Sequence, residues 1–248
     1  MTMPATLQTA LRERRALKVI SGLMNFDHDR VLAVAKAAQR GGATFLDIAA
    51  DASLVRLVRQ SCSLPICVSA VEPEQFVAAV EAGADLVEIG NFDAFYAQGR
   101  RFEAPEVLAI TRRTRALLPH IPLSVTVPHI LPLDQQANLA EALVAAGADL
   151  IQTEGGTSSQ PIHSGTLGLM EKALPTLAAA AEISKVVNVP VLCASGLSAV
   201  TVPLAIAAGA SGVGVGSAIN RLDNELAMIA TVQSLVEALG RVGLPQRV

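Results

Sequence analysis

The stretch that decides the fold is PVLCASGLSAVTVPLAIAAGASGVGVGSAINR, residues 190–221. It predicts a strand, a tight glycine turn, a short helix, a second strand and a second glycine-rich turn that opens another helix. Backbone N–H groups at such turns form an anion-sized donor pocket. In a (β/α)8 barrel, the phosphate site commonly lies after the seventh and eighth strands. The predicted phosphate-binding residues are Ser195, Gly196, Gly214, Gly216 and Ser217. The alternative is that these glycines only allow close packing of helix and strand.

Length and composition agree with a barrel. The chain has 248 residues, and one (β/α)8 barrel has about 250. Hydrophobic residues make up 51% of the chain and aromatic residues only 3%, so the core must be aliphatic, which suits parallel strands buried on both faces. We predict a single α/β domain over residues 1–248, a (β/α)8 barrel with a short N-terminal helix. A Rossmann-like open sheet is the alternative, but no early GxGxxG supports it.

A repeated glycine motif sets the phase of the strands. GGAT at 41–44, AGAD at 82–85, AGAD at 146–149 and AGAS at 208–211 each follow a helical pattern and precede an apolar run. The glycine is expected in the left-handed region as a helix C-cap, with the next strand starting directly after it. The even strands are predicted over 45–50, 86–90 and 150–154, with the eighth strand within residues 190–221. The first, third and fifth strands are predicted over 17–22, 66–70 and 123–127, and the seventh also lies within 190–221. Prolines precede the third, fifth and seventh strands.

Charge and cysteine content exclude several classes of protein. The net charge of −3 argues against a nucleic-acid partner, which requires a basic surface. Residues 186–220 carry no Asp, Glu, Lys or Arg, but Pro190, Pro203 and the glycines divide them into pieces too short to span a membrane. The three cysteines lack metal-ligand spacing, so no metal is assigned, and buried free thiols indicate a reducing compartment. No secretory signal is recognised, which favours the cytoplasm, and a homo-oligomer is left open.

Charged side chains are predicted inside the barrel. Aligning the even strands on their glycines places Asp47, Glu88 and Gln152 at equivalent positions, with Glu154 two residues further on. Because side chains alternate along a strand, all of these are expected to point inward. Lys18 is the only lysine in a predicted strand. It is interpreted either as a Schiff-base nucleophile, general acid or anion anchor, or as a structural lysine that neutralises Asp47 or Glu88.

The carboxyl ends of the strands carry the other candidate residues. Glu154 ends its strand and is the candidate general base, with Lys18, Glu88 and Asp47 in support; the alternative is that it accepts hydrogen bonds from loop N–H groups. His129, after the fifth strand, and His163, in the loop after the sixth, are candidates for proton transfer because an ordinary imidazole titrates near neutrality. The remaining residues predicted to line the pocket are Asn91, Thr126, Gly155 and Gly156.

Two nearly identical tripeptides follow the first and fourth strands, at 25–27 and 91–93 (NFD in both cases). An Asx turn that caps the following segment explains Asp27 and Asp93, while Asn91 is free to bind a ligand. The loop that follows, 92–102, holds three of the six phenylalanines and the single tyrosine. It is expected to be either a lid or a partner surface.

Several segments together resemble a known family. KVISGLMNFD, FLDIAAD, LPICVSAVEPEQF, VEIGNFDAFY, LSVTVPHILPLDQQ, IQTEGGTSSQ and CASGLSAVTVPLAIAAGASGVGVGSAINRL are similar to the hypothetical chloroplast reading frame twenty-three family over about residues 14–235. The resemblance implies a barrel fold and an origin in cyanobacteria or algal plastids, where the location would be the stroma. It implies no reaction.

Two looser resemblances concern the ligand. The turns at 194–196 and 214–218 resemble those of phosphate-binding barrels such as thiazole synthase, indole-glycerol-phosphate synthase and the histidine-pathway isomerases, which implies a phosphate site. QTEGG at 152–156, with His163 and Gly165, resembles flavin-dependent nitronate monooxygenases and inosine-monophosphate dehydrogenase, which implies FMN as a cofactor, although the spacing to the histidine is longer here.

We therefore expect a barrel that binds a small phosphorylated molecule at its C-terminal mouth and acts as a lyase, isomerase or synthase. The alternatives are an FMN-binding oxidoreductase and a non-catalytic metabolite sensor or scaffold, so catalysis itself is left open.

Overall fold

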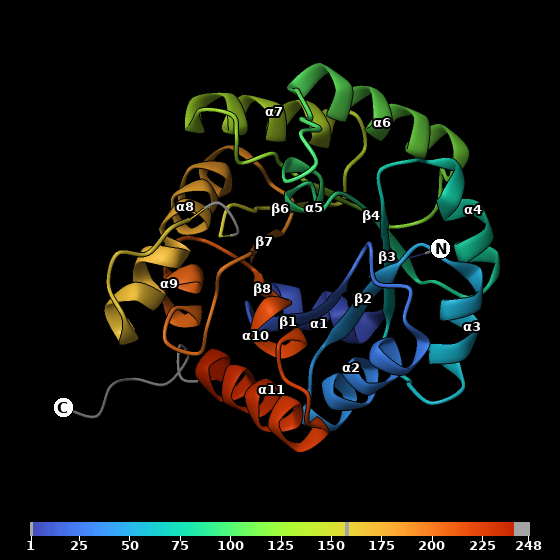
Figure 1. Ribbon diagram of the computed structural model, residues 1–248. Coiled ribbons are helices and arrows are strands. Elements are labelled where there is room, and N and C mark those ends of the chain that lie inside the picture. The colour runs from blue at the N-terminus through green and yellow to red at the C-terminus, as the bar shows by residue number, and fades with distance from the viewer. Residues whose placement is uncertain (1, 157–158, 241–248) are drawn as a thin grey trace.

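Eight parallel strands close into a barrel with helices around it (Figure 1). The structure, a computed structural model, describes residues 2–156 and 159–240. Each strand pairs with the next in chain order, and β8 closes on β1, as Lys18 opposite Gly214 shows. The predicted (β/α)8 barrel is confirmed. Within the described residues, no helix is both long enough and apolar enough to cross a bilayer.

The strands and helices alternate along the chain. The strands are β1 (Ala16–Gly22), β2 (Phe45–Ala49), β3 (Ile66–Ala70), β4 (Leu86–Ile89), β5 (Leu123–Thr126), β6 (Leu150–Gln152), β7 (Val191–Ala194) and β8 (Gly212–Val215). The helices are α1 (Ala5–Arg12), α2 (His28–Gly41), α3 (Ala52–Arg59), α4 (Glu74–Glu81), α5 (Asp93–Tyr96), α6 (Ala104–Leu117), α7 (Leu133–Ala145), α8 (Gly165–Val186), α9 (Val202–Ala207), α10 (Ser217–Asn220) and α11 (Glu225–Gly240).

The glycine repeat acts as the sequence predicts. Gly42, Gly83, Gly147 and Gly209 have φ of +86°, +112°, +105° and +111°, in the region that glycine adopts without steric cost. Each stands between a helix and the following even strand, so the predicted phase of the strands is confirmed. The main differences are that β6 ends two residues earlier than expected and that the loop after β4 contains the short helix α5.

The N-terminal end of the barrel is closed by α1, which lies behind the strands in Figure 1. Leu7 and Leu11 of this helix belong to one buried apolar cluster with inward-facing residues from the start of the strands. Those residues include Phe45, Leu86, Leu150 and Leu192. The amphipathic helix therefore fills the end of the barrel opposite the carboxyl ends of the strands.

Above this apolar layer lies a buried charged layer centred on Lys18. Its Nζ is 2.7 Å from Glu88 Oε2, 3.8 Å from Asp47 Oδ1 and 3.1 Å from Gln152 Oε1. Ser124 donates to Glu88 at 2.7 Å, and Ser69 donates to Asp47 at 2.5 Å. The predicted inward orientation is confirmed, and the contacts favour the structural interpretation of Lys18.

Burial and neighbouring charge oppose each other in this layer. Burial raises the pKa of Asp47 to about 6, although the Lys18 ammonium acts in the opposite direction. Burial alone would lower the pKa of Lys18, but the carboxylates of Asp47 and Glu88 raise it above its ordinary value. Lys18 is therefore charged and offsets part of the negative charge of the two carboxylates.

Replacing Lys18 tests its structural role. Lys18→Met should lower the free energy of unfolding by about 3–5 kcal/mol, because it leaves buried carboxylates without their cation. Urea denaturation followed by circular dichroism measures this change. Lys36→Met, on the exposed side of α2, is the control and should change stability by less than about 0.5 kcal/mol. An equal small effect of both substitutions would contradict the structural role.

The pKa of Asp47 predicts a pH dependence of stability. Its folded value of about 6 lies above the ordinary 3.8, so the folded state holds this proton more tightly than the unfolded state. The resulting stabilisation is complete below about pH 4 and is lost as the pH rises through about 6. The free energy of unfolding of the wild type relative to Asp47→Asn should therefore fall between those values. Urea denaturation across this range measures it, and a constant or rising difference would contradict the assignment.

Candidate functional site

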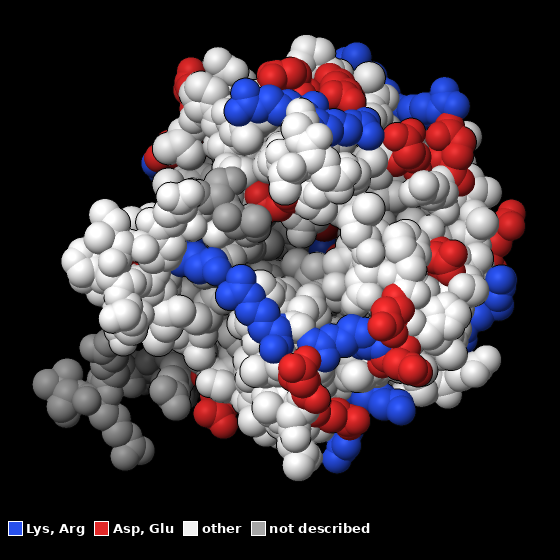
Figure 2. Space-filling view, viewed as in Figure 1, with Lys and Arg blue, Asp and Glu red and all other residues white. Residues whose placement is uncertain are grey.

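A cavity of about 730 Å³ opens at the C-terminal mouth of the barrel. Figure 2 shows this end of the molecule, where a hollow lies near the centre. The polar residues that line it come from distant parts of the chain: Ser21, Asn25, Asn91, Asp93, Ser159, Lys172, Ser195, Ser217 and Arg221. The cavity therefore collects the loops that follow β1, β4, β6, β7 and β8.

One side of the cavity is basic. Lys172 of α8 and Arg221, just after α10, both line it, and Figure 2 shows basic side chains along the edge of the hollow. Within residues 2–156 and 159–240, no hydrogen bond or ion pair is formed by either side-chain cation. Two such cations beside glycine turns suit an anionic ligand.

Four of the five predicted phosphate-binding residues line the cavity: Ser195, Gly196, Gly216 and Ser217. Ser195 has a φ of +77°, unusual for a residue with a side chain. Its hydroxyl donates to Asp93 Oδ2 at 3.0 Å and accepts from the Gly156 N–H at 3.0 Å. The structure differs from prediction at Gly214, which lies inside β8. A Cβ there would be 2.8 Å from that of Ala194, so Gly214 allows close packing.

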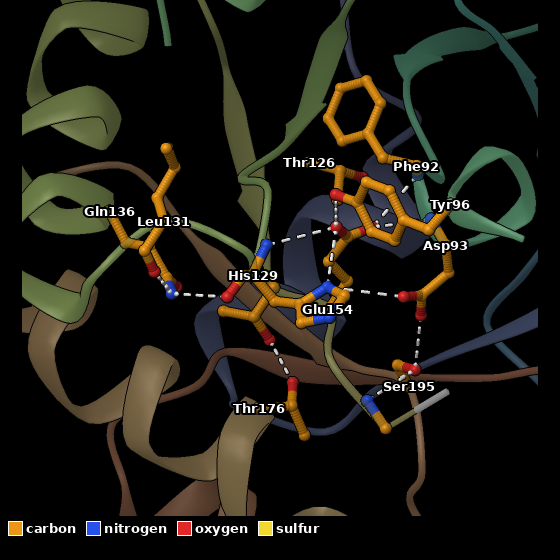
Figure 3. Close-up of polar contacts among 12 residues, drawn as sticks. Phe92, Asp93, Tyr96, Thr126, His129, Leu131, Gln136, Glu154, Thr176 and Ser195 are labelled. Atoms are coloured by element: carbon orange, nitrogen blue, oxygen red, sulfur yellow. Dashed lines mark hydrogen bonds and ion pairs between the residues drawn. The ribbon is translucent and has the colours of Figure 1, made fainter. Parts of the chain in front are cut away.

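The carboxylate of Glu154 is the centre of the acidic side of the mouth (Figure 3). Its Oε2 accepts from the backbone N–H groups of Phe92 at 3.0 Å and Asp93 at 3.2 Å. Its Oε1 accepts from the Tyr96 hydroxyl at 2.6 Å and the His129 backbone N–H at 3.2 Å. The side chain is 1% exposed. Glu154 thus fixes the loops after β4 and β5, and the alternative interpretation, acceptance from loop N–H groups, fits its contacts.

His129 lies between two carboxylates. Its Nδ1 is 3.1 Å from Glu154 Oε1 and 3.4 Å from Asp93 Oδ1. The side chains of His129 and Asp93 are 11% and 8% exposed. Figure 3 shows the three side chains converging, with Asp93 extending toward Ser195. The group joins the acidic side of the mouth to the turn after β7.

The pKa values in this group are shifted. Burial raises the pKa of Glu154, and the hydrogen bond from His129 opposes the shift. Burial alone would lower the pKa of His129, but the contact with Glu154 and the charge of Asp93 raise it. Burial and the Glu154 charge raise the pKa of Tyr96 well above its ordinary value, so Tyr96 is a permanent hydrogen-bond donor.

The other predicted residues divide into two sets. Asn91 and Gly156 line the cavity. Gly155 packs against His129, and Thr126 is buried and accepts from the Gln152 side chain.

His163 was predicted in the pocket, but it lies at the surface, where its Nδ1 is 2.5 Å from Glu171. The structure places Lys18, Asp47 and Glu88 below the mouth, in the charged layer, and none of the three lines the cavity.

Asp93 is the residue that sequence reasoning interpreted incorrectly. In the first tripeptide, Asp27 caps α2 by accepting from the Arg30 N–H, as predicted. In the second, Asp93 lies in the first turn of α5 and caps nothing; its side chain reaches Ser195 and His129. Lys172, Arg221 and Tyr96 were also missed. The only available signal was the clustering of aromatic residues around Tyr96.

The phenylalanine side chains of the loop at 92–102 pack inward and do not form an exposed partner surface. Phe92 and Phe102 are completely buried, with ring centroids 4.5 Å apart. Phe95 packs on Phe102 at 5.5 Å. The cluster anchors the loop against the barrel, so α5 and the Glu154 contacts have a fixed base.

A larger groove, of about 1330 Å³, lies at the opposite end of the barrel beside α1. Its main cations already have partners: Arg14 donates to Ala210 O at 3.1 Å and Arg115 to Gly147 O at 2.6 Å. These arginines donate to backbone oxygens just before the strands begin. The C-terminal mouth therefore remains the candidate site.

Fold and mouth together define a (β/α)8 barrel with a polar cavity at the C-terminal ends of its strands. The chain is similar to thiamine phosphate pyrophosphorylase from Pyrococcus furiosus (TM-score 0.62, 18% identity, 94% of this chain and 99% of that chain). It is also similar to 3-hexulose-6-phosphate synthase (TM-score 0.63, 18% identity, 90% and 99%). Identities this low establish the fold alone.

The chain belongs to the family described as Protein of unknown function (DUF561), whose model matches residues 3–242. It is 46% identical over 220 residues to the uncharacterized protein ycf23 of Cyanophora paradoxa, covering 88% of this chain and 90% of that protein. It is 39% identical over 239 residues to the ycf23 protein of Pyropia yezoensis, covering 96% and 88%. The resemblance to the reading frame twenty-three family is confirmed.

The contacts of Glu154 predict a large effect of an isosteric change. Glu154→Gln should lower the free energy of unfolding by about 2–4 kcal/mol, because charge-assisted hydrogen bonds are lost and the new amide faces donors. Amide hydrogen exchange at Phe92 and Asp93 should also become faster. Urea denaturation and exchange NMR measure these effects. The control, Glu182→Gln, removes an exposed ion pair with Lys185 and should cost less than about 1 kcal/mol.

Proposed function

We propose that this barrel binds a small phosphorylated molecule in the cavity at its C-terminal mouth and converts it in a lyase, isomerase or synthase type of reaction. The observation that carries the proposal is that the cavity has a basic side and an acidic side. Lys172, Arg221 and Ser217 line it, together with the glycine turns, and Asn91 and Asp93 line it as well. Under this proposal, the protein acts on small metabolites in the cytoplasm, and in the plastid stroma in its algal relatives.

The basic side suits the phosphate. A phosphate group carries up to two negative charges and several acceptor oxygens. The Lys172 ammonium and the Arg221 guanidinium supply positive charge and donors, and the exposed Ser217 hydroxyl adds a further donor. Charge-assisted hydrogen bonds of this kind are the stronger ones in proteins. Gly196 and Gly216 let the two turns pack closely against their neighbours, because a Cβ would be 2.7 Å from Lys172 O at Gly196 and 3.2 Å from Ile20 O at Gly216.

The acidic side suits the part of the ligand that reacts. Asp93 lines the cavity and contacts His129. Glu154 fixes both residues, because it accepts from the Asp93 backbone N–H and contacts the His129 imidazole. We assign contact with the ligand to Asp93, which lines the cavity, and a positioning role to His129 and Glu154. The oxygens of Glu154 are already occupied by four other donors besides the imidazole. Lys18, Asp47 and Glu88 take no part in this assignment.

The phosphate side is tested by ligand binding. The wild type should bind members of a panel of sugar phosphates, measured by calorimetry and by 31P NMR, and should not bind their dephosphorylated forms. Lys172→Ala with Arg221→Ala should weaken binding at least about 100-fold, since each charged hydrogen bond contributes about 1.5–3 kcal/mol. Lys36→Ala with Arg112→Ala, at exposed positions on α2 and α6, removes the same charges elsewhere and should leave affinity unchanged.

Three outcomes would overturn the proposal in different ways. Binding that is equal in both double variants would remove the basic side of the cavity from the site. Binding without turnover of any bound compound would favour a metabolite sensor or scaffold. A yellow protein that releases FMN on denaturation would identify a flavin oxidoreductase instead.

A further inference from the structure

We infer that Asp93, His129 and Glu154 form a binding site for one divalent transition-metal ion, of the Zn²⁺ or Mn²⁺ type. The three residues follow the neighbouring strands β4, β5 and β6, so the barrel brings their side chains to one point of the mouth. The inference goes beyond the proposed phosphorylated ligand and stands without it, because the ligand atoms are on the protein.

The distances fit a metal. His129 Nδ1 is 3.1 Å from Glu154 Oε1 and 3.4 Å from Asp93 Oδ1. One ligand atom from each of the three residues lies within 4.8 Å of the other two. Two ligand atoms that are each about 2.1 Å from a metal, at angles between octahedral and tetrahedral, are about 3.0–3.4 Å apart. Both contacts of the imidazole already have this spacing.

The charge and hydrogen bonding of the group also call for a cation. Asp93 Oδ1 is buried and accepts no hydrogen bond from any residue that the structure describes. Its side chain is 8% exposed, so water compensates little for the missing donor. Two buried carboxylates and one neutral imidazole balance the charge of a divalent ion. The charged layer below differs, since its carboxylates already have the Lys18 ammonium.

Each carboxylate is held by its second oxygen. Glu154 Oε2 accepts from the N–H groups of Phe92 and Asp93. Asp93 Oδ2 accepts from the Ser195 hydroxyl. Glu154 Oε1 and Asp93 Oδ1 face His129 Nδ1. Oε1 also accepts from the Tyr96 hydroxyl and the His129 N–H, whereas Oδ1 accepts from no described residue. Outer hydrogen bonds of this kind orient the ligands of metal sites in proteins. A metal would replace the proton on Nδ1, which leaves to solvent.

The surroundings indicate a metal that acts on a ligand. One imidazole and two carboxylates suit Zn²⁺ and Mn²⁺ better than Mg²⁺ or Ca²⁺, which prefer oxygen alone. Three protein ligands leave at least one coordination position open, as in catalytic sites. Because Asp93 lines the cavity, this position would be open to a water molecule or to an oxygen of a bound ligand, which the metal would polarise as a Lewis acid.

Calorimetric titration of the chelator-treated full-length protein tests the inference. Zn²⁺ and Mn²⁺ should each bind at one ion per chain, and Mg²⁺ should bind at least 100-fold more weakly. Asp93→Asn keeps the shape of the side chain and should weaken Zn²⁺ binding at least 100-fold. The matched control is Glu171→Gln, which alters a carboxylate that contacts a histidine at the surface, 2.5 Å from His163 Nδ1, and should leave this affinity unchanged.

A second measurement protects the test from loss of folding. Electron paramagnetic resonance of the Mn²⁺-loaded protein should show coupling to one imidazole nitrogen, and His129→Gln should remove it while the circular dichroism spectrum stays native. Absence of a stoichiometric ion in the wild type, or equal Zn²⁺ affinity in Asp93→Asn, would overturn the inference. Neither result bears on phosphate binding, which is measured separately with the Lys172 and Arg221 variants.

Discussion

The mouth of this barrel depends on one buried carboxylate. An ionised carboxylate removed from water is destabilising unless donors surround it, and Glu154 satisfies this requirement with donors from two loops, after β4 and β5. The same contacts fix α5, orient His129 and set the position of Asp93. The geometry of the acidic side of the cavity is therefore a consequence of how one charge is solvated by protein.

The two charged layers of the barrel show how similar residues take different roles. In the lower layer, Lys18 lies among Asp47, Glu88 and Gln152, and its ammonium contacts both carboxylates. At the mouth, Asp93 and Glu154 share a single imidazole, and one oxygen of Asp93 accepts no hydrogen bond from residues 2–156 and 159–240. The lower layer therefore stabilises the barrel. The upper layer faces the cavity and keeps a carboxylate oxygen that accepts no hydrogen bond from a described residue.

Much of the fold was predictable from the sequence, but only part of the site was. The helix-ending glycines depend on local backbone sterics, so Gly42 and its equivalents set the strand phase, and side-chain alternation then placed Lys18 and Glu88 inside. Asp27 and Asp93 show the limit, because identical tripeptides lead to a helix cap in one case and a tertiary contact in the other. Lys172 and Arg221 reach the cavity only through packing of α8 and α10, and no local pattern records that.

The closure of the barrel by α1 affects how a ligand exchanges with solvent. Leu7 and Leu11 fill the N-terminal end with apolar side chains, and the Lys18 layer lies directly above them. Among the described residues, these side chains fill the floor of the barrel, so the cavity opens to solvent at the mouth. Whatever enters at the mouth must leave by the same route, so the loop that carries Asp93 and Tyr96 lies on the path of both arrival and release. The residence time of a ligand in the cavity is then controlled by the loop at the mouth.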